Sequence, residues 1–244
     1  MARGTGSVVA VIPARFASTR LPGKPLLQET GKFLIQHVYE RVRSCPSLDR
    51  VVVATDDERI HQAVKSFGGE VVMTSNRHPS GTDRLAEAVR GIDCAKVINV
   101  QGDEPEIETH LIDAVIGLLD QGAEMATLAV PFADPQDAML PHRVKVVVDR
   151  HHNALYFSRS RLPHGGTSPL LHLGIYGYTK AFLQRFVTLD PTPLEQAEKL
   201  EQLRALEHGY KIKVGIVKVR SKGGIDTPED YAAFVQRMRE RVPS

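Results

Sequence analysis

Short apolar runs alternate with amphipathic segments through the first half of the chain. Runs of four to six mainly β-branched or apolar residues are typical of buried strands, whereas apolar residues three and four apart indicate helices. The predicted strands are Val8–Ile12, Val51–Ala54, Glu70–Met73, Lys96–Val100 and Ala126–Pro131. The predicted helices between them are Lys32–Arg43, Asp57–Phe67, Thr82–Arg90 and Glu108–Leu119. This alternation predicts an α/β fold with a mostly parallel sheet that helices cover on both faces.

The second half of the chain has a less regular pattern. Val144–Val148 and Ala154–Phe157 flank a polar turn, which predicts an antiparallel hairpin. Further strands are predicted at 173–178 and 212–219, and helices at 179–187, 194–207 and 228–239. Thr55 or Asp56 is the expected N-cap of the helix that begins near Asp57. We expect a single domain over residues 1–244, with a smaller antiparallel insertion at about 132–178.

Composition narrows the class of protein. The 244 residues are 42% hydrophobic and 25% charged, as in ordinary globular domains. A net charge of +2 and 6% aromatic residues do not favour a nucleic-acid partner. No apolar run approaches the roughly 20 residues of a membrane span, so no membrane partner is expected. Two cysteines exclude a disulfide scaffold and a four-thiolate zinc site. We therefore expect a cytoplasmic enzyme that acts on small molecules.

Three cations follow the first predicted strand. Arg15, Arg20 and Lys24 lie in a loop of small residues, and the common dinucleotide and P-loop glycine patterns are absent. Ligands of open α/β sheets bind outside the carboxyl ends of the strands. Arginine and lysine in that position suit a polyphosphate, although a solvated basic loop would have the same composition.

Two carboxylates are candidate metal ligands. Asp103 directly follows the predicted strand Lys96–Val100, and Asp226 precedes the last predicted helix. Mg²⁺ commonly takes one or two carboxylates together with substrate phosphates. The alternatives are a simple turn around Asp103 and a helix cap at Asp226. Sequence spacing does not decide whether the two side chains meet.

Five segments, taken in order, resemble one enzyme family. They are Ile12–Pro25, Ser80–Glu87, Asn99–Pro105, His172–Tyr178 and Ile225–Asp230. Together they are similar to the CMP-Kdo synthetases, the 3-deoxy-manno-octulosonate (Kdo) cytidylyltransferases, from about Val8 to about Arg239. The resemblance implies a nucleotide-diphosphosugar transferase-like fold. It also implies a Mg²⁺-dependent transfer of CMP from CTP to Kdo, which yields CMP-Kdo and pyrophosphate for lipopolysaccharide synthesis, by a homodimer.

The resemblance also implies the roles of individual residues. Arg15 and Lys24 would be catalytic residues at the triphosphate, and Asp103 and Asp226 would be catalytic and bind Mg²⁺. The remaining CTP-side residues would be Ala14, Ser80, Gly81 and Arg84, the last three at the cytosine. The residues around Kdo would be Gln101, Arg159, His172, Tyr176 and Glu201.

Several alternatives stay open at this point. The loop Ser160–Pro169 is shorter than is usual in the family and lacks an arginine after Pro163, so the sugar acid could instead be sialic acid or an amino-Kdo variant. A non-catalytic nucleotide-binding protein is the other reading, but Asp103 and Asp226 are both retained. His172 could be a core histidine, and Arg84 could pair with Asp83 or Glu87. We expect one of Tyr176 and Tyr178 to face the core and the other the site.

Overall fold

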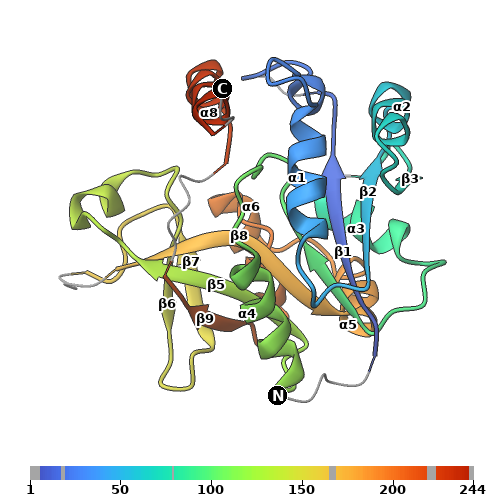
Figure 1. Ribbon diagram of the computed structural model, residues 1–244. Coiled ribbons are helices and arrows are strands. Elements are labelled where there is room, and N and C mark those ends of the chain that lie inside the picture. The colour runs from blue at the N-terminus through green and yellow to red at the C-terminus, as the bar shows by residue number, and fades with distance from the viewer. Residues whose placement is uncertain (1–5, 18–19, 79, 165–168, 219–223, 242–244) are drawn as a thin grey trace. The chain divides into compact units, whose positions relative to one another are not determined.

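The computed structural model describes residues 6–17, 20–78, 80–164, 169–218 and 224–241 (Figure 1). These residues form two compact units, each with its own set of strands and helices. Unit 1 holds residues 6, 95–98 and 111–218, and unit 2 holds residues 7–94, 99–110 and 224–241. In the part of the chain that the structure describes, no helix has both the length and the apolar character needed to cross a membrane.

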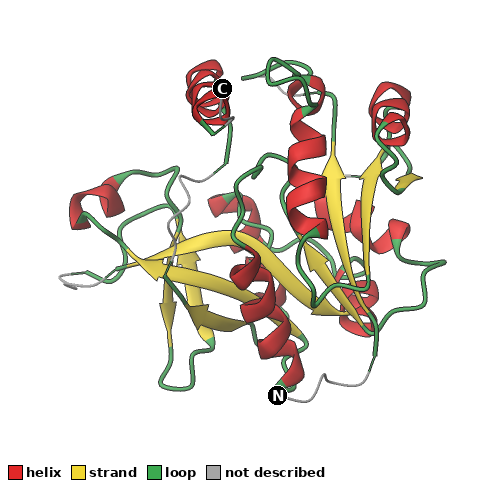
Figure 2. Ribbon diagram, viewed as in Figure 1, coloured by secondary structure: helices red, strands yellow, loops and turns green. Residues whose placement is uncertain are grey.

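Unit 2 is built on three parallel strands. β1 (Val8–Ala14) pairs with β2 (Arg50–Thr55), and β2 pairs with β3 (Val71–Met73). The helices of this unit are α1 (Leu34–Arg43), α2 (Glu58–Ser66), α3 (Gly81–Ala88) and α8 (Pro228–Glu240), with a short 3₁₀ turn, η1, at Lys24–Leu26 (Figure 2). α1 and α3 pack against β1 and β2, which are buried along almost their whole length. Continuous burial on successive residues requires cover on both faces of the strands, as predicted.

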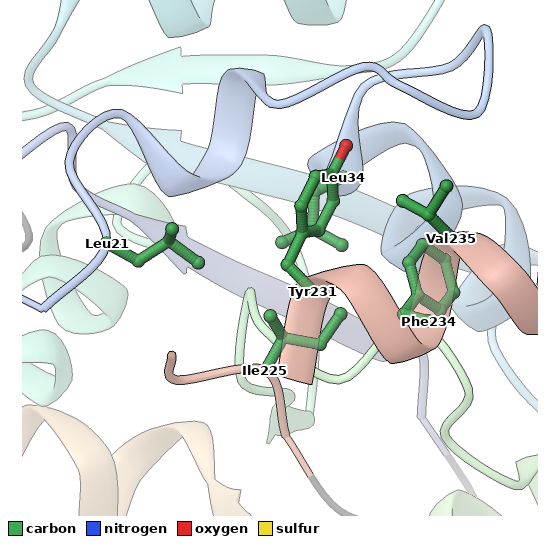
Figure 3. Close-up of a cluster of buried hydrophobic side chains, with 6 residues drawn as sticks. All are labelled: Leu21, Leu34, Ile225, Tyr231, Phe234 and Val235. Atoms are coloured by element: carbon green, nitrogen blue, oxygen red, sulfur yellow. The ribbon is translucent and has the colours of Figure 1, made fainter. Parts of the chain in front are cut away.

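The C-terminal helix is attached to unit 2 by an apolar cluster. Tyr231, Phe234 and Val235 of α8 are buried with Leu34 of α1 and Leu21 of the first loop (Figure 3). Ile225, just before the helix, is buried in the same cluster. The residues between Ile225 and Tyr231 are therefore fixed against the first loop of the chain by burial of apolar surface.

Unit 1 combines parallel and antiparallel strands. Its main strands run in the order β4 (Lys96–Asn99), β8 (Leu170–Thr179), β5 (Met125–Pro131) and β9 (Lys213–Ile216). β5 is antiparallel to β8 and parallel to β9, and the predicted hairpin is confirmed as β6 (Lys145–Val148) and β7 (Ala154–Ser158). The remaining elements are α4 (Thr109–Asp120), η2 (Pro135–Met139), α5 (Lys180–Phe186), α6 (Pro193–Glu198) and α7 (Leu203–Glu207).

Two sequence predictions about helices are wrong. The N-cap of α2 is Asp57, whose side chain accepts the N–H of Arg59, and not Thr55 or Asp56. The helix predicted at 194–207 is two helices, because Lys199 adopts a left-handed conformation with φ of 55° and ends α6. A single left-handed residue ends a helix without disturbing the spacing of apolar residues, so periodicity could not reveal the break.

Candidate active site

A cavity of about 400 Å³ in unit 2 brings together most of the residues predicted to bind nucleotide and metal. It lies at the carboxyl end of β1 and beside the segment that follows β4. The predicted site residues that line it are Ala14, Arg15, Lys24, Gly81, Gln101, Asp103 and Asp226. The structure therefore brings the first loop and the two carboxylates together at a strand end, a point that the sequence spacing left open.

The ammonium of Lys24 is the centre of this cavity's charge arrangement. Its Nζ donates to Asp103 Oδ2 at 2.7 Å, to the carbonyl of Ile225 at 2.8 Å and to Asp226 Oδ1 at 3.3 Å. Arg20 adds a second cation 3.0 Å from Asp226 Oδ1. Only 14% of the Lys24 side chain and 28% of the Asp103 side chain are exposed, so solvent screens this pair less than it screens surface ion pairs.

Backbone contacts place the two carboxylates side by side. The N–H of Ile225 donates to the carbonyl of Asp103 at 2.8 Å. The N–H of Asp226 donates to Asp230 Oδ2 at 3.0 Å, and Thr227 is the N-cap of α8. Asp226 is therefore not the helix cap, and its own carboxylate is available to the cavity that it lines.

Gly102 lets the segment after β4 approach the end of β1. A Cβ at this position would lie 2.8 Å from the carbonyl oxygen of Pro13, which is closer than side chains allow. Any other residue would push Gln101 and Asp103 away from Ala14 and Arg15. This close approach explains the glycine between the two predicted site residues.

Sequence inspection missed one titratable group beside Asp103. Burial and the neighbouring Asp103 carboxylate raise the pKa of Glu104 to about 7. Nothing in the sequence distinguishes Glu104 from a solvated acidic residue, because the shift depends on burial that only the fold creates.

The donor set of the cavity fits a divalent cation. Two carboxylates already converge on one cationic group, Lys24 Nζ. Oxygen ligands of this kind suit Mg²⁺, which needs few protein ligands when phosphates supply the others. No cluster of three or more His, Cys, Asp or Glu side chains that could hold a metal occurs among the residues described. Asp103 and Asp226 are thus a pair that would bind Mg²⁺ together with a phosphate-bearing ligand.

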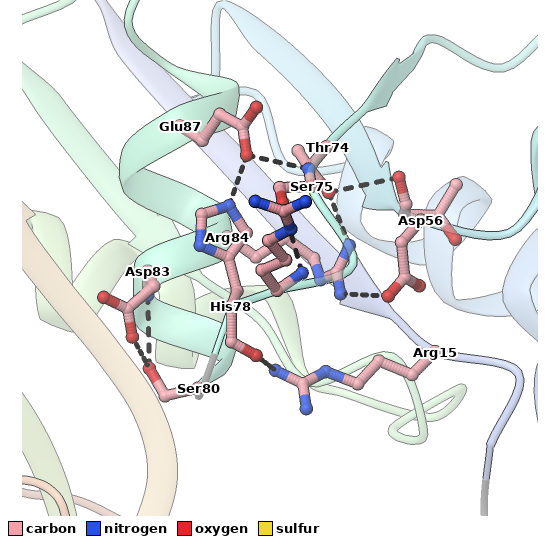
Figure 4. Close-up of polar contacts among 11 residues, drawn as sticks. Arg15, Asp56, Thr74, Ser75, His78, Ser80, Asp83, Arg84 and Glu87 are labelled. Carbon is pink, nitrogen blue, oxygen red and sulfur yellow. Dashed lines mark hydrogen bonds and ion pairs between the residues drawn. The ribbon is translucent and has the colours of Figure 1, made fainter.

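The predicted cytosine-side residues are fixed in different ways (Figure 4). Ser80 is the N-cap of α3, and its Oγ accepts the N–H groups of Thr82 and Asp83. Arg15 Nη2 reaches the carbonyl of His78 at 3.5 Å, in the loop that leads to Ser80. Gly81 lines the cavity, whereas Ser80 holds the loop and helix start next to it.

Arg84 is a buried cation with partners inside the protein rather than a solvent-exposed side chain. It is 1% exposed, donates to Thr74 Oγ1 and forms an ion pair with Asp56 at 2.7 Å. Its partner is therefore neither Asp83 nor Glu87. A role at the cytosine, which the resemblance implies for Arg84, stays a prediction.

We expect Arg84→Met to lower the free energy of unfolding by about 3 kcal/mol, because it leaves the Asp56 carboxylate without its buried partner. Arg15→Met is the matched control, since with the described residues Arg15 makes one long hydrogen bond, and its loss should leave stability almost unchanged. Urea unfolding of both variants measures the difference. Equal stability of the two variants would contradict the structural role of Arg84.

In unit 1, a bulge between β5 and β8 lies beside two of the residues predicted to surround the sugar, His172 and Tyr176. The register of β5 and β8 shifts between Thr127 and Leu128, where β8 has two extra residues. Thr127 Oγ1 lies 3.0 Å from His172 Nε2 and donates to the carbonyl of Ile175 at 2.8 Å. Bulges of this kind often redirect side chains near functional sites. Here the bulge places His172 and Tyr176 around one threonine.

Burial perturbs the titratable groups of this cluster. Desolvation lowers the pKa of His172 to about 3, and its ring centroid lies 5.3 Å from that of Tyr176. Burial is the main cause that raises the pKa of Tyr176, and the nearby Tyr178 and Glu201 raise it further. The Tyr176 hydroxyl makes no hydrogen bond to the residues that the structure describes. A buried hydroxyl without a partner is expensive unless a ligand or water satisfies it.

One prediction about this strand is wrong. Tyr176 and Tyr178 do not face opposite ways, because residues two apart lie on the same side of a strand. Their rings stack with centroids 6.1 Å apart. Tyr178 is buried in the core, whereas Tyr176 is half-buried and lies between the rings of His172 and Tyr178.

The low pKa of His172 predicts a pH dependence of stability. The unfolded chain protonates this histidine below about pH 6.5, whereas the folded protein does so only near pH 3. Its stabilising contribution is therefore complete above about pH 6.5 and is lost as the pH falls toward 3. The loss at pH 5 should be about 2 kcal/mol.

Urea unfolding at pH 7 and pH 5 checks this prediction when wild type is compared with His172→Gln. The wild type should lose about 2 kcal/mol more than the variant between these pH values. Identical losses in the two proteins would contradict a desolvated, neutral His172.

Arg159 lies at the end of β7, in a dense set of contacts. Its Nε donates to the carbonyl of Glu198 at 2.8 Å, and its terminal nitrogens reach the carbonyls of Pro141 and Lys199 at 3.3 Å each. These contacts use three of five guanidinium donors. The shortened loop beyond Arg159 includes residues 165–168, which lie outside the described part of the chain.

Comparison with known proteins finds relatives over most of the chain. The cytidylyltransferase family profile matches residues 9–212. A protein from Syntrophobacter fumaroxidans named 3-deoxy-manno-octulosonate cytidylyltransferase is 51% identical over 241 residues, which cover 93% of this chain and 95% of its own length. A protein from Shewanella pealeana named 8-amino-3,8-dideoxy-manno-octulosonate cytidylyltransferase is 49% identical over 242 residues, covering 95% and 98%.

A solved structure is similar in both sequence and fold. It is described as CMP:2-keto-3-deoxy-manno-octonic acid synthetase complexed with CTP. The TM-score is 0.91 at 42% identity, and the match covers 97% of this chain and 100% of that one. The α/β fold with a mostly parallel, mixed sheet is thus shared with a CTP-binding protein over nearly its full length.

Proposed function

The chain belongs to the cytidylyltransferase family, in the group of the 3-deoxy-manno-octulosonate cytidylyltransferases, and on this premise we propose that it transfers CMP from CTP to Kdo. The anomeric hydroxyl of Kdo attacks the α-phosphorus of CTP, and pyrophosphate leaves. The observation that carries the proposal is the pairing of Asp103 and Asp226 around Lys24 in a cavity that Arg15 also lines.

The charge of the reactants is the main obstacle to this reaction. CTP carries about four negative charges and the sugar acid carries one more, so the nucleophile is repelled unless those charges are offset. Arg15 and Lys24, which line the cavity at the end of β1, would bind the phosphate oxygens. Arginine offers a planar fork of donors for this purpose, and lysine a compact charge.

Asp103 and Asp226 would hold Mg²⁺, which when bound acts as a Lewis acid and as a template for the phosphates and the attacking hydroxyl. The two carboxylates engage Lys24 in the free protein. When a triphosphate enters the cavity, the Lys24 ammonium has a stronger anionic partner, and both carboxylates become available to the metal. Lys24 would then stabilise the pyrophosphate as it leaves.

On the sugar side, the proposal assigns the Kdo carboxylate to Arg159 and the sugar hydroxyls to Gln101, His172, Tyr176 and Glu201. Arg159 has two guanidinium N–H donors beyond the three that bind these backbone carbonyls. A carboxylate bound in a bidentate manner accepts two such hydrogen bonds. The neutral imidazole of His172 and the buried hydroxyl of Tyr176 are suited to hydrogen bonding with hydroxyl groups.

The names of several Shewanella relatives point to a second sugar. The Shewanella pealeana protein, 49% identical to this chain, carries the name of an 8-amino-3,8-dideoxy sugar. An 8-amino group replaces a neutral hydroxyl by an ammonium, so it would need an acceptor or carboxylate where Kdo needs only a hydroxyl partner. The same transfer to the 8-amino sugar is therefore the alternative function.

Initial rates of pyrophosphate release with CTP and three sugar acids test the proposal. We expect the highest kcat/KM with Kdo, a lower value with the 8-amino sugar and none with sialic acid. A preference for the 8-amino sugar would replace Kdo by the alternative, and activity with sialic acid alone would overturn the assignment of both.

Parts of the proposal rest on family membership alone. They are the homodimer, the cytoplasmic location and the supply of CMP-Kdo for lipopolysaccharide synthesis. Light scattering of the purified chain tests the first of these, since a homodimer would have twice the 26.9 kDa mass of the chain.

A further inference from the structure

A fully buried lysine in unit 1 has no role in the reaction described above. Lys145, the first residue of β6, is 0% exposed. Its ammonium donates to the carbonyl of Leu140 at 3.2 Å and to the carbonyl of Arg159. Burying a charged ammonium is costly, and lysine is almost never fully buried unless its charge is compensated. An apolar residue at this strand position would avoid that cost, so the ammonium calls for an explanation.

The contacts of Lys145 converge on Arg159. The carbonyl of Leu140 precedes Pro141, whose own carbonyl accepts from Arg159 Nη1. The second acceptor is the carbonyl of Arg159 itself. One ammonium therefore joins the backbone of Arg159 to the loop that also binds the Arg159 guanidinium.

Glu198 binds the N–H of the same residue, Arg159. Its carboxylate accepts the hydroxyl of Ser158 at 2.5 Å and the N–H of Arg159 at 2.9 Å, while its carbonyl accepts from Arg159 Nε. The Glu198 carboxylate also acts on Lys145 at longer range, and it opposes the effect of burial, which lowers the pKa of that lysine. The buried ammonium of Lys145 and the half-buried carboxylate of Glu198 thus compensate each other at the backbone of Arg159.

We propose that Lys145 and Glu198 are positioning residues for Arg159, and that they set the affinity of the enzyme for the carboxylate of the sugar acid. This inference rests on the proposed function, in which Arg159 binds that carboxylate. Lys145 holds the Arg159 carbonyl, Glu198 holds its N–H, and the carbonyls of Pro141, Glu198 and Lys199 hold its guanidinium. Arg159 is therefore fixed at both ends before the sugar binds, which lowers the entropic cost of binding.

Initial rates of Lys145→Met test this inference. Methionine retains much of the buried stem but removes the ammonium. We expect KM for Kdo to rise on the order of tenfold, since a small displacement of Arg159 weakens the carboxylate contact, while KM for CTP stays unchanged. Glu198→Gln should raise KM for Kdo less than Glu198→Ala, because the amide oxygen can still accept one of the two hydrogen bonds.

Lys96→Met is the matched control. Lys96 is a second buried lysine of unit 1, 8% exposed and ion-paired with Asp120 at the start of β4. The Lys96→Met substitution also removes a buried ammonium, so it should lower Tm. Lys96 makes no contact with Arg159, and KM for Kdo should therefore stay at the wild-type value.

A double variant distinguishes positioning from general destabilisation. If Lys145 acts through Arg159, the variant that combines Lys145→Met with Arg159→Ala should have the same KM for Kdo as Arg159→Ala alone. Additive effects, an unchanged KM in Lys145→Met, or an equal change in the KM of both substrates would overturn the inference. If the wild type forms no CMP-sugar with either sugar acid, the proposed function fails, and the inference fails with it.

Discussion

Replacing Asp103 by Asn should lower kcat roughly 1,000-fold with saturating CTP and Kdo, while the protein stays folded. The substitution keeps the size of the side chain and removes its charge. Asp103 lies 2.7 Å from Lys24 Nζ, and it is one of only two carboxylates among the predicted site residues that line the cavity in unit 2. A carboxamide would neither offset the charge of a divalent cation nor hold it against the phosphates.

Stability is the control for Asp103→Asn. The lost ion pair is partly exposed and should cost about 1 kcal/mol, far less than the expected change in the barrier to reaction. Thermal unfolding and circular dichroism should therefore resemble those of the wild type. Near-normal turnover in a folded Asp103→Asn protein would contradict the assignment of the metal site.

Removing the ammonium of Lys24 should weaken the reaction with CTP and tighten the binding of Mg²⁺. In Lys24→Met, kcat/KM for CTP should fall on the order of 100-fold, because a cation that contacts the triphosphate and the departing pyrophosphate is gone. Mg²⁺ binding without nucleotide should tighten about tenfold, because Lys24 no longer competes for Asp103 and Asp226. Both carboxylates then repel each other until a cation binds between them.

A titration of Tm with Mg²⁺ in the absence of CTP measures the second effect. The variant should be stabilised at lower Mg²⁺ concentrations than the wild type, since a ligand that binds only the folded state raises Tm. Arg20→Met is the matched control, because among the described residues Arg20 forms an ion pair with Asp226 and not with Asp103, and its side chain is 65% exposed. If Lys24→Met binds Mg²⁺ no better than wild type, Lys24 does not occupy the position of the metal.

Periodicity predicted the elements of the fold because local patterns reflect the faces that each element buries. The apolar runs Val8–Ile12 and Val51–Ala54 predict most of β1 and β2, and the predicted helix at 228–239, after Asp226-Thr-Pro, is α8. The break at Lys199 escaped prediction, because it depends on one backbone torsion.

The candidate site was only partly accessible from the sequence. The cations after β1 and the carboxylate after β4 could be placed by the rule that ligands bind at strand ends. Spacing could not show that Lys24 meets Asp226, because 202 residues separate them. His172, Tyr176 and Glu201 came from the resemblance, since nothing in their local pattern distinguishes them from core or surface residues.

Buried charges were the hardest features to predict. Arg84 finds its partner in Asp56, 28 residues away, and Lys145 sits between valines in a strand that reads as apolar. Their burial, and the raised pKa of Glu104, arise from tertiary packing that no local window contains. The roles of such groups can be inferred only from the distances between side chains in the folded protein.

The most direct measurement is ³¹P nuclear magnetic resonance of one reaction that contains the protein, CTP, Kdo and Mg²⁺. Attack at the α-phosphorus predicts equal amounts of CMP-Kdo and pyrophosphate, with no signal from CDP or inorganic phosphate. Omitting Kdo or chelating Mg²⁺ should abolish both products. Unchanged CTP in the complete reaction, or CDP with a phosphorylated sugar, would contradict the transfer of CMP.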